Sequence, residues 1–181
     1  MTCKMERSEI DRLVRHNIAN LTPYSTARDE YQGELGTFLD ANESPYENGY
    51  NRYPDPHQRR LKARLSAIKG VPAENIFIGN GSDEAIDLIF RIFCEPREDN
   101  VVAIAPSYGM YKVAAAINDI EVREVQLGED FSLPVDAMLA RADAHTKAMF
   151  LCSPNNPTGN AFPREEMLRL ADSFDGITVV D

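Results

Sequence analysis

The segment Gly79-Asn80-Gly81-Ser82-Asp83 follows a short apolar run and precedes a helical pattern. A helix that begins here has backbone N–H groups without partners at the positive end of its dipole, and such groups bind phosphate. Gly81, Ser82 and Asp83 are therefore candidate phosphate ligands. Ser82 is equally consistent with an ordinary N-cap. The third glycine of the dinucleotide fingerprint and the Lys-Ser/Thr ending of a Walker loop are missing, which argues against a nucleotide site.

A second polar segment, SPNNPTG at residues 153–159, directly follows the apolar run 148–152. If that run is a parallel strand, the segment lies at its carboxyl end, where open α/β sheets bind ligands. The two prolines restrict the loop, and Asn156, before Pro157, has a side-chain amide that can donate to a ligand oxygen. A tight turn without a ligand is the alternative interpretation.

Tyr108 and Asp181 also follow apolar runs that are typical of strands. An aromatic ring at position 108 can stack on a planar heterocycle, although a half-buried tyrosine at the start of a helix is the alternative. We expect the Asp181 carboxylate to be buried, which requires a cation or a donor such as a protonated ring nitrogen. The three histidines, His16, His57 and His145, lie in surface-like contexts and receive no catalytic role.

These segments are separated by helical and strand-like patterns that alternate from about residue 57 onward. Such alternation is typical of βαβ units and predicts an α/β fold with a mainly parallel sheet. Apolar runs predict strands at 76–78, 101–105, 120–125, 148–152 and 177–180. Apolar faces predict helices at 57–69 and from about 81 to 93. They also predict a helix that follows residues 106–110 and ends at about 118, a short helix after Pro134, and a helix that begins at Pro163.

The first 56 residues differ from the rest, because a stretch rich in Pro, Tyr, Asn and Gly follows a predicted helix at about 8–16. We interpret residues 1–56 as an N-terminal arm with part of a small domain, and residues 57–181 as the front part of a larger domain. The sequence ends in a β-branched apolar run, 176–181, of the kind that forms a buried strand. We therefore expect it to be the front part of a longer protein; a natural domain that ends on this strand is the alternative.

The composition fits one ordinary domain, with 181 residues, 43% hydrophobic and 27% charged. Its 19 Lys and Arg against 29 Asp and Glu give a net charge of −10, which argues against a nucleic-acid partner. No apolar run approaches the roughly 20 residues of a membrane helix, and the first residues are too polar for a signal peptide. We predict a cytoplasmic protein without a metal site, whose three separated cysteines are free thiols.

Together, the phosphate cradle, the aromatic ring, the amide and the carboxylate resemble the cofactor site of fold-type I pyridoxal-phosphate aminotransferases. The SPNNPTG loop is highly specific for class I and II aminotransferases. Within that group the sequence looks like the histidinol-phosphate aminotransferases, and the resemblance covers residues 17–181. The motifs that carry it are LTPY at 21–24, LDANESP at 39–45, RYPDP at 52–56 and PSYGMY at 106–111.

The resemblance implies pyridoxal 5'-phosphate as cofactor and a three-layer large domain of which this chain holds only part. It implies that Tyr108 stacks on the pyridine ring, that Asn156 donates to the phenolate oxygen and that Asp181 pairs with the pyridine nitrogen. The backbone at Gly81, Ser82 and Asp83 would hold the cofactor phosphate.

The same resemblance implies a homodimer with shared sites, because Tyr53 in this family reaches the cofactor phosphate of the neighbouring subunit. Tyr24 and Asn42 would face the substrate. The implied reaction moves an amino group between L-histidinol phosphate and 2-oxoglutarate, giving glutamate, in histidine biosynthesis. The lysine that forms the Schiff base lies beyond the chain end, so we assign no catalytic residue here and expect these 181 residues alone to be inactive.

Several alternatives stay open. Another class I or II aminotransferase, such as an aromatic aminotransferase, or a threonine-phosphate decarboxylase shares much of the pattern. A truncated, non-catalytic binding module is favoured by the missing lysine. A sugar-nucleotide or dinucleotide binder is disfavoured by the incomplete glycine fingerprint.

Overall fold

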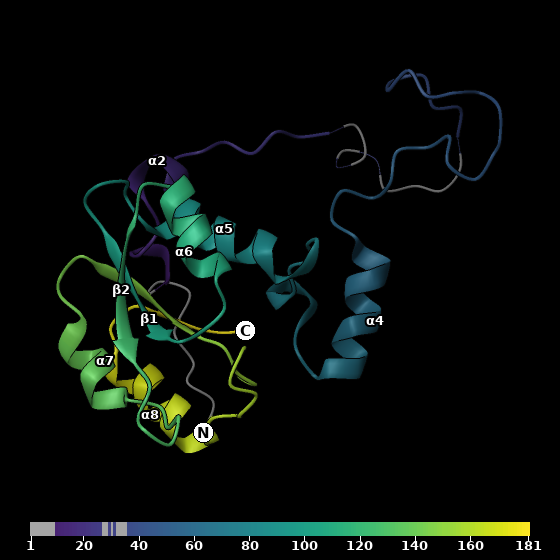
Figure 1. Ribbon diagram of the computed structural model, residues 1–181. Helices are drawn as coiled ribbons and strands as arrows, with labels where there is room; N and C mark the ends of the chain where they lie inside the picture. Colours follow the sequence, from purple (N-terminus) through teal and green to yellow (C-terminus); the bar gives the residue numbers. More distant parts are fainter. Residues whose placement is uncertain (1–9, 27–28, 30, 32–35) are drawn as a thin grey trace. The chain divides into compact units, whose positions relative to one another are not determined.

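The computed structural model describes residues 10–26, 29, 31 and 36–181 (Figure 1). It divides the chain into two compact units. One unit contains Asn80–Asp181 together with the chain up to Leu21, and the other is Thr22–Gly79.

The first unit is built on a four-stranded sheet in the order β2-β1-β3-β4, with every neighbouring pair parallel (Figure 1). The central strands β1 and β3 are almost entirely buried, as continuous apolar runs in a covered parallel sheet require. This sheet confirms the α/β fold class and four of the five predicted strands. The strands are β1 (Asn100–Ala105), β2 (Glu121–Gln126), β3 (Thr146–Leu151) and β4 (Ile177–Val180).

Helices cover both faces of this sheet and make a three-layer arrangement (Figure 1). Helices α5 and α6 bury Phe90 and Tyr111 against Val101 on one face. Helices α7 and α8 bury Met138 and Leu170 on the other. The helices are α2 (His16–Ala19), α5 (Gly81–Phe93), α6 (Met110–Ile117), α7 (Val135–Arg141) and α8 (Arg164–Ser173).

The predicted helix at about 8–16 is interrupted in its described part. Ile10 and Asp11 are helical as predicted, but a turn follows at Arg12 and Leu13, Arg15 has a non-helical backbone, and α2 begins at His16. The Arg15 amide donates to the Ile92 carbonyl at 2.9 Å, and its guanidinium pairs with Glu95 at 2.8 Å. These contacts to the end of α5 replace the helical hydrogen bonds. Residues 8 and 9 lie outside the described residues.

The second unit contains α4 (Arg59–Lys69) and a 3₁₀ turn (Ala73–Asn75). Helix α4 ends as predicted at Gly70, which has φ +67° and donates to the Ser66 carbonyl at 2.9 Å. Its predicted apolar stripe is largely exposed, however, with Leu61 at 49% and Ile68 at 63%. The strand predicted at 76–78 is also wrong, because this extended segment pairs with no strand in the described part of the chain.

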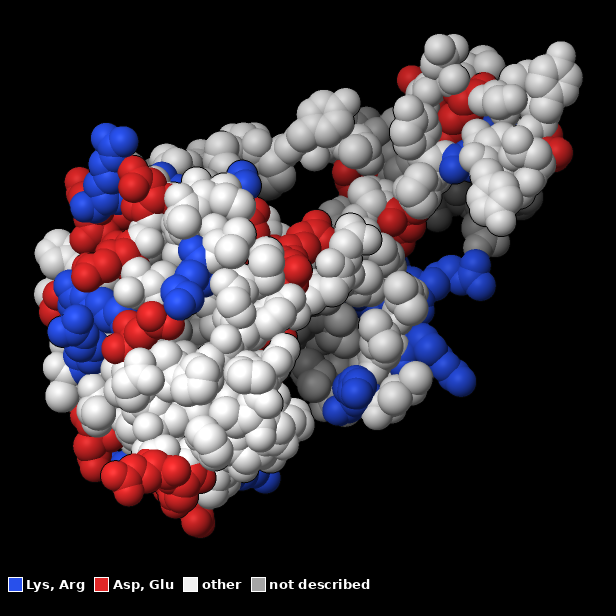
Figure 2. Space-filling view, viewed as in Figure 1, with Lys and Arg blue, Asp and Glu red and all other residues white. Residues whose placement is uncertain are grey.

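Charged side chains on the face shown in Figure 2 often lie next to their opposites. Arg97 pairs with Asp119 at 2.6 Å and Arg123 pairs with Asp143 at 2.6 Å. The Asn100 amide and the Arg123 guanidinium hold the pKa of Asp143 well below its usual range. Within the described ranges, no helix is long and apolar enough to cross a membrane.

Candidate ligand site at the carboxyl edge of the sheet

The polar segments singled out from the sequence meet at one edge of the first unit. Because β1, β3 and β4 are parallel, the loops that follow them leave the sheet at the same edge. Tyr108 follows β1, the SPNNPTG loop follows β3 and Asp181 follows β4. A hydrogen bond of 3.0 Å from the Tyr108 hydroxyl to Asp83 Oδ1 joins the start of α5 to this edge.

The start of α5 presents open backbone donors. Gly81 has φ +76°, which favours glycine at this position. The first amides of a helix lack intrahelical partners, and no hydrogen bond from outside α5 reaches the amides of Gly81, Ser82 or Asp83 among the described residues. Ser82 is the second residue of the helix rather than its N-cap, and the Asn80 amide donates instead to the Glu84 carboxylate at 2.5 Å. The helix start therefore has the donors that an anion requires.

Two tyrosines connect the helix start to the end of β4. Tyr108 is half-buried, and Tyr111, at 1% exposure, donates from its hydroxyl to Asp181 Oδ2 at 3.0 Å. The hydrogen bond to Asp83 raises the pKa of Tyr108, with burial adding to it. Burial, and then the charge of Asp181, raise the pKa of Tyr111 well above its usual range. Both tyrosines are therefore neutral hydrogen-bond donors at neutral pH.

The expectation that Asp181 is buried is wrong, because its side chain is only partly covered. Its main chain is fixed on both sides, since its amide donates to the Leu151 carbonyl and its carbonyl accepts from the Ser153 amide, each at 2.9 Å. The carboxylate sits at the rim of the sheet instead of inside the core. It is therefore open to a ligand while Tyr111 holds one of its oxygens.

The two asparagines of the SPNNPTG loop have opposite environments. Asn155, at 2% exposure, donates to the Pro106 carbonyl at 3.0 Å and to Thr158 Oγ1 at 2.6 Å, and it accepts from Ser107 Oγ at 2.9 Å. Asn156 is exposed, and no hydrogen bond of its side chain occurs among the described residues. Asn155 thus fastens the loop to the end of β1, while the amide of Asn156 is available to a ligand.

Asn155 and Tyr111 are site residues that the sequence reasoning missed. Asn155 stands beside a residue of the same type, and only its burial distinguishes the two. Tyr111 lies three residues after Tyr108, a spacing that places both on one side of a helix start. That spacing is the signal that was available for Tyr111.

Three predicted site residues belong to the second unit. Tyr53 and Tyr24, at 63% and 88% exposure, both line a cavity of about 480 Å³. Asn42 is exposed, has φ +52° and does not line that cavity. The Tyr53 amide donates to Glu43 at 2.9 Å.

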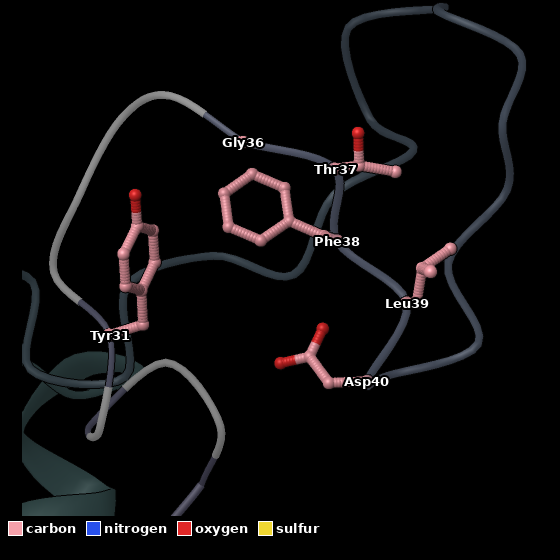
Figure 3. Close-up of a pocket in the computed structure, with 6 residues that line it drawn as sticks. All are labelled: Tyr31, Gly36, Thr37, Phe38, Leu39 and Asp40. Atoms are coloured by element: carbon pink, nitrogen blue, oxygen red, sulfur yellow. The ribbon is translucent and has the colours of Figure 1, made fainter.

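A further cavity of about 560 Å³ in the second unit has two aromatic residues, Tyr31 and Phe38, among those that line it (Figure 3). The rings of Tyr31 and Phe38 lie edge to face with centroids 5.7 Å apart. The Arg52 guanidinium lies 5.6 Å from the centre of the Phe38 ring. Asp40 lines this cavity as well as the one that contains Tyr53.

The lysines described in the first unit are paired with carboxylates outside the candidate site. Lys112 Nζ is 3.0 Å from Glu124, and Lys147, near the amino end of β3, is 3.6 Å from Asp99. Lys62 and Lys69 belong to α4 in the other unit. In the part of the chain that the structure describes, no lysine forms an ion pair with a residue of the site.

The donor set at this edge suits one kind of ligand. Open helix amides bind an anionic group, an aromatic ring packs on a planar ring, and an amide donates to a ring oxygen. A carboxylate accepts from a protonated ring nitrogen. A phosphorylated heteroaromatic ring with a cationic nitrogen therefore fits these residues.

Comparison with known proteins agrees with this geometry. The family described as aminotransferase class I and II matches residues 32–181. Histidinol-phosphate aminotransferase of Parabacteroides distasonis is 56% identical over 93% of this chain and 49% of its own length. That of Bacteroides fragilis is 57% identical over 95% and 50%. The chain thus spans about half the length of these curated relatives.

Solved structures with similar folds include two aminotransferases. Histidinol-phosphate aminotransferase from Sinorhizobium meliloti, in complex with pyridoxal-5'-phosphate, has a TM-score of 0.66 and 25% identity over 72% of this chain and 36% of its own. Tyrosine aminotransferase from Leishmania infantum has a TM-score of 0.63 and 25% identity over 74% and 40%.

Proposed function

The chain belongs to the class I and II aminotransferase family, and from this we propose that it is the N-terminal half of a pyridoxal-phosphate-dependent histidinol-phosphate aminotransferase. The enzyme would transfer an amino group between L-histidinol phosphate and 2-oxoglutarate in histidine biosynthesis. Relatives that carry this name at 56% and 57% identity support the substrate. The observation that carries the proposal is the meeting of open α5 amides, Tyr108, Asn156 and Asp181 at one sheet edge.

Pyridoxal 5'-phosphate, when bound, supplies an electron sink next to the α-carbon of an amino-acid substrate. The amides of Gly81, Ser82 and Asp83 bind its phosphate at the positive end of the α5 dipole. Asp181 holds a proton at the ring nitrogen, because a carboxylate beside that nitrogen favours its charged form. This keeps the ring electron-poor, which is the property that transamination uses.

Tyr108 and Asn156 orient the ring. The half-buried ring of Tyr108 is tied at its hydroxyl to Asp83, so it offers a fixed face for stacking. Asn156 projects from a loop that Asn155 fastens to the end of β1, so its amide has a defined position from which to donate to the ring oxygen. Both contacts orient the cofactor and leave proton transfer to another group.

That other group, the lysine that forms the Schiff base, belongs in our proposal to the rest of a longer protein. The first turn of α5 carries the carboxylates of Asp83 and Glu84, so a phosphate bound there requires cations close by. Arginines from the same missing half would supply them. We propose further that the enzyme is a cytoplasmic homodimer, in which Tyr53 reaches the neighbouring subunit's cofactor and Tyr24 and Asn42 contact substrate.

The test is to express the protein from its whole gene and to incubate it with L-histidinol phosphate and 2-oxoglutarate, with phenylalanine as the competing amino donor. We expect a cofactor that copurifies with the protein, glutamate as product, and a higher kcat/KM for L-histidinol phosphate than for phenylalanine. A preference for phenylalanine would contradict the substrate assignment. A protein that takes up no cofactor would contradict the whole proposal.

A further inference from the structure

Tyr111 is buried beside the candidate site, and its hydroxyl donates to Asp181 Oδ2 at 3.0 Å. Tyr111 is the second residue of α6, while Asp181 follows β4, 70 residues later in the chain. The hydrogen bond therefore joins the helix layer to the carboxyl edge of the sheet.

The ring of Tyr111 is held in place by aromatic neighbours. Its centroid lies 5.0 Å from that of Phe150 on β3 and 5.7 Å from that of Tyr108, which it meets edge to face at 86°. Phe150 in turn stacks on Phe90 of α5 at 5.2 Å. With 1% of its surface exposed, Tyr111 has no room for another rotamer, so its hydroxyl has a fixed position.

The Asp181 main chain is fixed by β3, but its side chain is only partly covered and would otherwise turn freely. A hydrogen bond to a charged acceptor is stronger than one between neutral groups. The bond from Tyr111 to Oδ2 therefore favours one orientation of the carboxylate, and no hydrogen bond to Oδ1 occurs among the described residues.

We propose that Tyr111 is a positioning residue that orients the Asp181 carboxylate toward the cofactor ring nitrogen. This inference rests on the proposed function, since it requires a cofactor whose nitrogen pairs with Asp181. Tyr111 touches Asp181 and acts through it. In the proposed function Tyr108 would contact the cofactor directly, whereas Tyr111 meets the Tyr108 ring edge to face.

The experiment compares the wild-type protein from the whole gene with Tyr111→Phe, Asp181→Asn and the double variant. Tyr111→Phe keeps the packed ring and removes only the hydroxyl. Tyr46→Phe is the matched control, because Tyr46 is 80% exposed and has no role in the proposed site. The readouts are the absorption spectrum of the bound cofactor, the ¹⁵N chemical shift of its labelled ring nitrogen, kcat/KM and the melting temperature.

We expect Tyr111→Phe to shift the ring-nitrogen resonance toward its unprotonated value and to lower kcat/KM about tenfold, which corresponds to about 1.4 kcal/mol. In the Asp181→Asn background the same change should have almost no further effect on the resonance, because the partner through which Tyr111 acts is gone. Tyr46→Phe should match the wild type in every readout.

A lower melting temperature with an unchanged resonance would show that Tyr111 is only a core residue and would overturn the inference. Equal shifts from Tyr111→Phe in both backgrounds would also overturn it, since Tyr111 would then not act through Asp181. If Tyr111→Phe does not fold, the ring-nitrogen resonance of the folded Asp181→Asn variant provides the test. If Asp181→Asn shifts that resonance no more than Tyr46→Phe does, Asp181 does not pair with the ring nitrogen, and the inference about Tyr111 fails with it. A wild-type protein without bound cofactor refutes the proposed function itself, a result that is distinct from these.

Discussion

Replacing each of the two neighbouring asparagines of the SPNNPTG loop with alanine should affect different properties: the stability of the protein for Asn155 and cofactor binding for Asn156. Asn155→Ala removes three side-chain hydrogen bonds, to Pro106, Thr158 and Ser107, from a site with 2% exposure. A hydrogen bond contributes about 1 kcal/mol net, so we expect the free energy of unfolding to fall by about 3 kcal/mol.

Asn156→Ala is the matched control for stability. Because this side chain is exposed and has no hydrogen bond among the described residues, its loss should change the free energy of unfolding by less than about 0.5 kcal/mol. It should instead weaken cofactor binding roughly tenfold, because it removes a donor to a charged oxygen.

Equilibrium urea unfolding of the cofactor-free protein from the whole gene gives the first quantity, and fluorescence titration with pyridoxal 5'-phosphate gives the second. If Asn156→Ala destabilises the protein as much as Asn155→Ala does, the loop is not fastened as described. If Asn155→Ala leaves the urea midpoint unchanged, its three hydrogen bonds contribute nothing to folding.

Three further predictions concern the site and its surroundings. Asp181→Asn should fold but lose most of its transamination rate, measured as glutamate formation; an unchanged turnover removes Asp181 from the mechanism. Tyr53→Phe should weaken cofactor retention in the dimer, measured by dialysis, and equal retention would count against a shared site. Because burial raises the Tyr111 pKa, the folded protein keeps a proton that the unfolded chain releases above about pH 10. The free energy of unfolding should therefore fall as pH rises above about 10, and urea unfolding should show a smaller fall for Tyr111→Phe.

The parallel sheet could be predicted because the apolar runs of its central strands are visible in the sequence. The runs at 101–105 and 148–152 are apolar throughout, as strands covered on both faces require, and the structure confirms both. Helix α5 was predictable from the spacing of Ile86 and Phe90, which are both buried. Local pattern and tertiary environment agree in these elements.

The remaining features depend on contacts that a local pattern does not contain. Residues 76–78 have strand-like side chains, but a strand also needs a neighbour, and the described chain provides none. Arg15 leaves helical geometry because of its partners at the end of α5. The apolar stripe of α4 predicts a helix correctly, but it does not predict which part of the chain, if any, packs against the stripe.

In the candidate site, too, some features followed from local sequence patterns and others depended on tertiary contacts. The types and places of Tyr108, Asn156 and Asp181 followed from the ends of strands, and the structure brings Tyr108 and Asp181 to the same edge as the SPNNPTG loop. Their proposed roles, and the domain division at residue 57, stay predictions. The partial exposure of Asp181, the last residue of the sequence, was not predicted, because exposure depends on tertiary neighbours that a strand pattern does not contain.

The most direct test of the central claim is a crystal structure of the protein from the whole gene with pyridoxal 5'-phosphate bound. Our account predicts the phosphate within hydrogen-bond distance of the amides of Gly81, Ser82 and Asp83, with the ring nitrogen on the Asp181 carboxylate. A phosphate bound elsewhere, or a ring nitrogen that faces away from Asp181, would contradict it.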